Sequence, residues 1–180
     1  MEYTAKDIKV LDLPDAIRKR PGMYIGDLNR LGAVRLIGMA VDLLTGLTKE
    51  DARGIYAYHA FLDVQVQGRD VIVRIDYNLN ECPDFENRCA EMIRNRDVFG
   101  PPDQPGISDL PILSALTTGL HVQGAGSILK NDGALPITHP EPAKDIAIAA
   151  RFQIRDQIDP HGLSQDYLEG FLNGHNQVRG

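Results

Sequence analysis

The 180-residue chain has few of the features that mark secreted, disulfide-bonded or membrane proteins. It contains two cysteines, Cys82 and Cys89, which are too few for a disulfide framework and fit a reducing cytoplasm. No second cysteine pair or nearby histidine completes a metal site around them. The sequence has no apolar run long enough to span a bilayer, and its polar N-terminus is not typical of a signal peptide. We therefore expect a cytoplasmic protein without a bound metal or a membrane contact.

The chain also lacks an excess of positive charge. It has 19 lysines and arginines against 25 aspartates and glutamates, which gives a net charge of −6. Autonomous nucleic-acid binding needs a basic face that neutralises phosphates, so we expect none. Arg18, Lys19 and Arg20 form a local basic cluster, which is more typical of the solvated end of a helix than of a nucleic-acid contact.

The remaining composition is that of an ordinary globular protein. The chain is 43% hydrophobic and 24% charged, and its length fits one domain with one core. We expect a single domain over residues 1–180, with an N-terminal arm at 1–12, a core at 13–158, and a C-terminal helix and tail at 159–180.

Helical and strand periodicities alternate along the chain. Residues 13–19 predict a short helix with Asp12 as N-cap, ended by Pro21 and Gly22. Residues 31–47 have apolar side chains at helical spacing and predict a long, buried helix. Residues 60–67 and 71–75 alternate around a Gly-Arg-Asp turn and predict a β-hairpin. Further along we expect a helix at 86–96, a loop at 99–108, a helix at 110–116, a strand at 146–158, and a helix at 164–172 that Ser164 caps and that stops near Gly174. This order predicts an α+β two-layer sandwich.

The most specific pattern is the run Arg-Lys-Arg-Pro-Gly-Met-Tyr-Ile-Gly at residues 18–26. Together with Tyr3, residues 8–11 and residues 15–16, it resembles the opening of the ATPase domain of type II topoisomerase B subunits, which are DNA gyrase B and its topoisomerase IV counterpart. Residues 109–116 and 149–152 resemble later parts of that domain, so the likeness spans roughly Tyr3 to Phe152 with loop deletions.

The resemblance implies a truncated Bergerat (histidine-kinase-like ATPase) fold with a mixed sheet. In that family a tyrosine-bearing arm crosses to the partner subunit. The residues that the likeness assigns to such an interaction are Tyr3, Arg18, Lys19, Arg20 and Tyr24.

The resemblance also locates the family's catalytic positions. A glutamate on the long helix acts as general base, and an asparagine four residues later on the same face holds magnesium. In this sequence those positions are Met39 and Leu43. A thioether cannot take a proton from water at neutral pH, and leucine has no oxygen for a hard cation. We therefore expect both residues to belong to the core.

The other nucleotide-binding positions of the family are changed as well. Asp76 matches the aspartate that holds the adenine, but Tyr77 and Leu79 replace glycines, and Asp76 also fits a turn residue at a strand end. Ile148 stands at the position of a threonine near the adenine. The glycine-rich run at 119–126 is too short for the family's ATP lid, so we expect the lid to be deleted and this run to be a flexible loop.

Three functional hypotheses follow from this pattern. The first is a catalytically degenerate gyrase-B-like domain that acts as an interaction or regulatory module, either as a homodimer or bound to a gyrase or topoisomerase IV subunit. The second is a residual nucleotide-binding module that takes ATP, and the third is a decayed paralogue. The sequence favours the first, which is not an enzyme and needs no cofactor.

Overall fold

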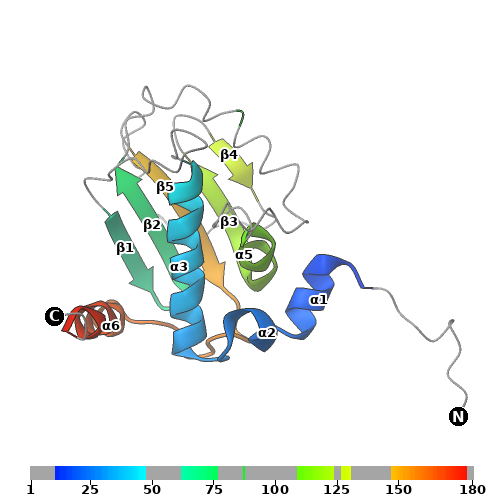
Figure 1. The fold of residues 1–180 in the computed structure, drawn as a ribbon, viewed down its shortest axis with the longest axis horizontal. Helices are drawn as coiled ribbons and strands as arrows, with labels where there is room; N and C mark the ends of the chain where they lie inside the picture. Colours follow the sequence, from blue (N-terminus) through cyan, green and yellow to red (C-terminus); the bar gives the residue numbers. More distant parts are fainter. Residues whose placement is uncertain are drawn as a thin grey trace, which may run out of the picture.

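The protein is an α+β two-layer sandwich. The computed structural model describes residues 11–47, 62–76, 87, 109–123, 127–130 and 147–177. Five described strands form one sheet in the order β1-β2-β5-β3-β4, and two helices, α3 and α5, cover one face of it (Figure 1). The strands are β1 (Leu62–Gln67), β2 (Asp70–Asp76), β3 (Thr117–Gln123), β4 (Ser127–Lys130) and β5 (Ala147–Ile154), and the helices are α1 (Leu13–Lys19), α2 (Gly22–Ile25), α3 (Arg30–Leu47), α5 (Leu110–Leu116) and α6 (Gln165–Gln177).

The two N-terminal helices form a corner that leads into α3. As predicted, Asp12 caps α1: its Oδ1 accepts a hydrogen bond of 2.8 Å from the Asp15 backbone N–H. The chain then turns at Pro21 into α2, a four-residue helix that the sequence did not predict. Asn29 caps α3, because its Oδ1 accepts from the Leu31 N–H at 2.8 Å.

The core lies between the sheet and helices α3 and α5. Alternate residues of β2, Val71, Val73 and Ile75, are buried on the helix-covered face. On β5, Phe152 is also completely buried and belongs to the same core. The period of two along the strands and the helical spacing along α3 together produce one continuous apolar layer.

The predicted hairpin and central strand are present, with one difference in direction and one in length. Every described strand pairing is antiparallel, so the expectation of a mixed sheet is wrong for this part of the chain. The strands β2 and β3 run in the same direction, but β5 lies between them and runs opposite to both. The strand β5 ends at Ile154 rather than at Ile158, because residues 156–158 form a turn in which the Ile158 N–H donates to the Arg155 carbonyl at 2.9 Å.

The segment expected to be a flexible loop contains a strand instead. The strand β3 follows α5 directly, and the Thr117 hydroxyl ties the two together by donating to the Leu113 carbonyl at 2.6 Å. Gly119 has a φ of 62° at an irregularity in the pairing with β5, a conformation that glycine adopts without strain. Residues 119–123 are therefore strand, while 124–126 lie outside the described residues.

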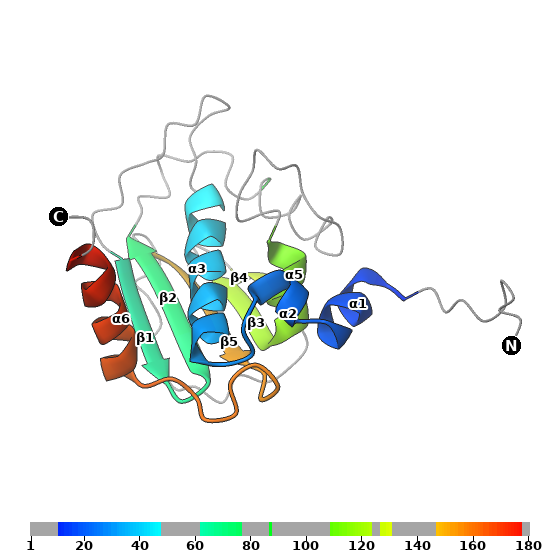
Figure 2. The ribbon, with the colours of Figure 1, turned by 60° about the horizontal axis from the view of Figure 1, so that its bottom comes forward.

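The C-terminal helix α6 lies along the outer side of β1 (Figure 2). The Ser164 Oγ accepts from the Tyr167 N–H at 3.2 Å, which confirms the predicted cap, but the helix continues past Gly174 to Gln177. The Gln165 side chain accepts from the Val66 N–H at 3.0 Å and donates to the Val64 carbonyl at 3.1 Å. One amide side chain thus binds the outward-facing backbone of β1 as a neighbouring strand would.

Three expectations concern residues outside the described part of the chain. They are the N-terminal arm with Tyr3, the helix expected at 86–96, of which only Asn87 is described, and the loop expected at 99–108.

Candidate functional site

Two of the residues that the resemblance aligns with the family's catalytic positions, Met39 and Leu43, lie on α3. Leu43 is completely buried, and Met39 is partly buried and packs against the core. Ile148, on β5, is also completely buried and pairs with Ile75 of β2. The side chains of Met39, Leu43 and Ile148 are apolar, so these positions contribute packing and offer no oxygen to a cation or a water molecule.

The structure places the predicted adenine-binding residue only by its backbone. Asp76 is the last residue of β2 and pairs with Ala147. Tyr77 and Leu79, which follow it, lie outside the described residues. The role of Asp76 therefore stays a prediction.

The predicted interaction residues on the α1–α2 corner fall into two groups. Lys19 and Arg20 are exposed at the end of α1. Tyr24 is half-buried against the core, and Arg18 is held in an ion pair with Asp15 at 2.6 Å. Lys19 and Arg20 are accordingly the two of these four that face solvent most.

Two apolar side chains beside this corner were missed from the sequence. Met23 is 72% exposed and Leu28 is 49% exposed, and both belong to the four large hydrophobic residues that are exposed in the described part of the chain. Met23 lies within the run at residues 18–26, two residues before the buried Ile25. Its place in that run was the sequence feature that could have indicated an exposed contact residue. An exposed methionine next to basic side chains is typical of a contact surface.

The run at residues 18–26 has a local structural role as well. Ile25 is completely buried, and its carbonyl accepts a hydrogen bond of 2.7 Å from Arg35 Nη1. Gly26 has a φ of 75°, and a Cβ atom at this position would collide with the Arg35 guanidinium. These contacts fix the direction in which the chain enters α3.

A pair of carboxylates near the end of α3 was also missed. Burial raises the pKa of Asp42, and the nearby charge of Asp109 raises this pKa further. The two residues are far apart in sequence, so no local pattern indicated the pair. Among the residues that the structure describes, no group of three or more acidic, histidine or cysteine side chains could hold a metal ion.

The raised pKa of Asp42 predicts that the free energy of unfolding depends on pH. A carboxylate whose pKa is higher in the folded state stabilises the fold below its unfolded pKa, and this contribution is lost as the pH rises through the folded pKa. The D42N variant should therefore melt slightly higher than the wild type at pH 7, by up to about 2 °C, with the difference disappearing near pH 3.5. Melting curves at both pH values test this, with D27N, which alters an exposed carboxylate, as control. A gain that persists at the lower pH would contradict the coupling.

Comparisons with known proteins agree with this architecture. The crystal structure of the B-subunit of the DNA gyrase from Myxococcus xanthus superposes with a TM-score of 0.52 and 18% identity, covering 87% of this chain and 47% of that one. Local sequence matches occur with the DNA gyrase B proteins of Archaeoglobus fulgidus, 57% identical over 42 residues, and of Campylobacter jejuni, 55% identical over 40 residues. The chain is gyrase B-like. No family model matches it.

The likeness is partial in length. The matched segments cover 23% and 22% of this gyrase B-like chain, and 7% and 5% of the two curated relatives. The chain thus resembles gyrase B in one short sequence stretch and in a truncated form of the fold. No helix in the described part of the gyrase B-like chain is long and apolar enough to cross a membrane.

Proposed function

We propose that the chain is a catalytically inactive gyrase B-like domain that acts as a protein-interaction or regulatory module. The observation that carries this proposal is the complete burial of Leu43 and Ile148 and the packing of Met39 against the core. An ATPase of this family needs a base and a magnesium ligand where these side chains stand. Under this proposal the domain works in the cytoplasm and needs no cofactor.

The α1–α2 corner supports an interaction role. It presents the exposed cations Lys19 and Arg20 beside the exposed Met23 and Leu28, and α1 lies on the opposite side of the molecule from α6 (Figure 1). Basic and apolar side chains together suit a protein surface that is acidic at its rim and apolar at its centre. The proposed partner is the B protein of gyrase or of topoisomerase IV, or a second copy of this acidic chain.

The partner proposal predicts a measurable effect on supercoiling. The purified chain should co-purify with the B protein of gyrase or topoisomerase IV and change the supercoiling rate of the holoenzyme. The M23D variant should weaken that effect about tenfold or more, because it places an unpaired charge in the contact. The matched control is L172D, which alters an exposed leucine on a different element, α6.

The outcomes separate the two partners. If M23D and L172D weaken the effect on supercoiling equally, the α1–α2 corner has no specific role in binding. Self-association in light scattering without binding to the topoisomerase protein would favour the homodimer.

The alternative function is a residual nucleotide-binding module, which the position of Asp76 at the end of β2 favours. Calorimetry with ATP, ADP and a non-hydrolysable analogue, each with and without magnesium, distinguishes it. The interaction proposal predicts no heat of binding in any of these titrations. Saturable binding that D76N removes would support the nucleotide module.

A further inference from the structure

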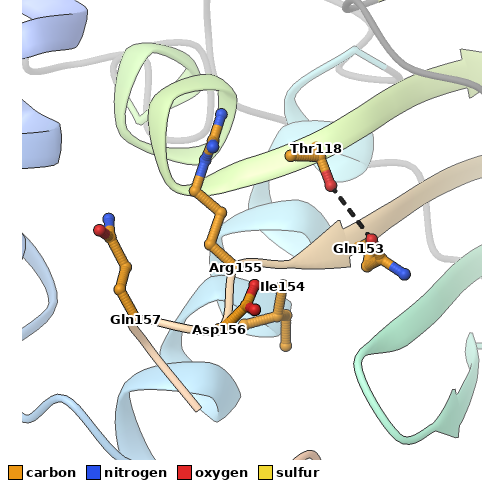
Figure 3. A pocket seen from close by; sticks show the side chains of 6 residues that line it. All are labelled: Thr118, Gln153, Ile154, Arg155, Asp156 and Gln157. Atoms are coloured by element: carbon orange, nitrogen blue, oxygen red, sulfur yellow. Dashed lines mark hydrogen bonds between the residues drawn. The ribbon is translucent and has the colours of Figure 1, made fainter. Parts of the chain in front are cut away.

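A polar pocket lies where β5 ends and β3 begins, away from the family's nucleotide position. Its volume is about 380 Å³, and its lining residues are Thr118, Gln153, Ile154, Arg155, Asp156 and Gln157. The close view shows these side chains grouped around the end of β5, with α5 beside them (Figure 3). Ile154 is six residues from Ile148 along the strand, which corresponds to roughly 20 Å. The pocket therefore cannot be part of the nucleotide position.

Arg155 is the main cation of this pocket. Its Nε donates to the Ala115 carbonyl at 3.0 Å, an interaction that neutralises the C-terminal end of α5. A guanidinium group carries four more N–H donors on its two terminal nitrogens. Among the described residues, the acceptor bonded to this guanidinium is the Ala115 carbonyl, and we assign the terminal N–H groups to a ligand.

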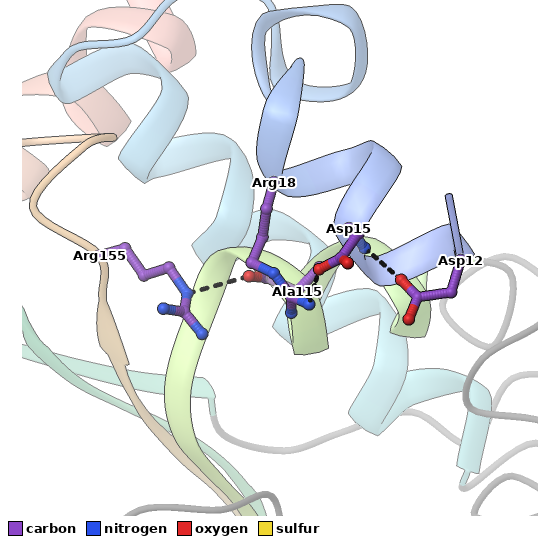
Figure 4. A network of polar contacts seen from close by, with 5 residues as sticks. All are labelled: Asp12, Asp15, Arg18, Ala115 and Arg155. Carbon is purple, nitrogen blue, oxygen red and sulfur yellow. Dashed lines mark hydrogen bonds and ion pairs between the residues drawn. The ribbon is translucent and has the colours of Figure 1, made fainter. Parts of the chain in front are cut away.

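A second arginine approaches Arg155 from α1. Figure 4 shows the side chains of Arg18 and Arg155 on either side of Ala115, near the last turn of α5. Burial lowers the pKa of Arg155, and the positive charge of Arg18 lowers it further, while Asp156 raises it. Two neighbouring cations repel each other, and an anion between them removes that repulsion.

The acidic group of the pocket has a partner of its own. Asp156 forms an ion pair with Arg69 at 2.5 Å, and its side chain is 83% exposed. The Gln153 amide is also engaged, because it donates to Asp70 at 3.0 Å and accepts from the Thr118 hydroxyl at 3.4 Å. Arg155 and the exposed Gln157 remain as lining residues whose N–H donors a ligand could use.

We propose that this pocket binds a phosphate-type oxyanion, with Arg155 as the main ligand residue and Gln157 as a second donor. The terminal nitrogens of a guanidinium group match two phosphate oxygens, and the remaining oxygens can accept from a third donor at the same time. A carboxylate can also accept several hydrogen bonds, but it carries less negative charge than a phosphate near pH 7 and interacts more weakly with two neighbouring cations. Arg18 contributes positive field from α1 and is not a direct ligand residue, since Asp15 holds it.

The test is a nuclear magnetic resonance titration of the full chain with inorganic phosphate at pH 7 and constant ionic strength. We expect saturable shifts of the backbone amides of Thr118, Asp156 and Gln157. R155Q should weaken binding about tenfold or more, which is the scale of a lost charged hydrogen bond. R18Q should weaken it a few-fold, and D156N should tighten it, because each changes the local charge.

The control variant is K19Q, which removes the same charge from the exposed side of α1. Equal weakening in K19Q and R18Q, or shifts scattered over the surface, would show a general field effect and overturn the site. Because R155Q also removes a contact to α5, its amide spectrum is compared with the wild type, and R18Q tests the site independently of that contact.

Two further ligands identify the chemistry of the site. Methyl phosphate should bind as inorganic phosphate does if the site takes the phosphate group of a larger molecule, whereas binding of inorganic phosphate alone would identify the free ion as the ligand. Equal binding of succinate would overturn the preference for phosphate. None of these outcomes depends on the fate of the proposed interaction role.

Discussion

Replacing Leu43 with asparagine should lower the free energy of unfolding by about 3–5 kcal/mol and restore no ATPase activity. The substitution reintroduces the residue type that the resemblance assigns to magnesium. In this chain, however, Leu43 is completely buried within the apolar core. The amide would lose its hydration without gaining a partner, and the apolar contacts of leucine would also be lost.

Chemical denaturation of L43N and of a matched L43M variant measures this effect. Methionine keeps the volume and apolar character of leucine, so L43M should cost less than about 1.5 kcal/mol. ATP hydrolysis is measured for both proteins with and without magnesium. A stable L43N variant that binds magnesium would contradict the packing interpretation and revive the enzyme hypothesis.

The same glycine-to-alanine substitution should have opposite effects at two positions of α3. A Cβ atom at Gly32 would collide with the Asp27 carbonyl oxygen and lie 3.1 Å from Ile25 Cδ1. The Asp27 backbone would have to move to make room for the new methyl group, so G32A should destabilise the protein by about 3 kcal/mol. A Cβ atom at Gly38 meets nothing within 4 Å, so G38A should stabilise the helix by about 0.5–1 kcal/mol.

Paired denaturation curves for G32A and G38A test this contrast, since the two variants share one helix and one chemical change. Similar shifts in both midpoints would show that helix propensity alone controls the effect. In that case, the close packing of α3 against the segment that precedes it would not matter for stability.

The elements that the sequence predicted best are those with local boundary signals. Asp12 at the start of α1 and Ser164 at the start of α6 satisfy the first backbone N–H groups by themselves. The end of β5 was placed too late because Ile158 is completely buried although it lies beyond the strand. The apolar pattern of β5 extends to the buried Ile158, although the extended backbone ends at Ile154.

The elements that were missed depend on contacts across the fold. The strand β3 follows α5 without a linker and contains Gly119, so its turn-like composition hid a strand that pairing with β5 stabilises. The Asp42 and Asp109 pair and the Arg18 and Arg155 pair each join distant parts of the chain. The assignment of Met39 and Leu43 to catalytic positions depends on the alignment that the resemblance supplies, and it stays a prediction.

The contact of Gln165 with β1 also affects the tendency of the protein to aggregate. The outermost strand of a sheet carries open N–H and C=O groups that can recruit strands from other molecules and start aggregation. The Gln165 side chain hydrogen-bonds the Val66 N–H and the Val64 carbonyl in the middle of β1. These two groups are therefore not open to a strand from another molecule. The C-terminal helix therefore covers an open strand edge in addition to packing against it, and we expect shortened versions of the domain that end before it to aggregate more readily.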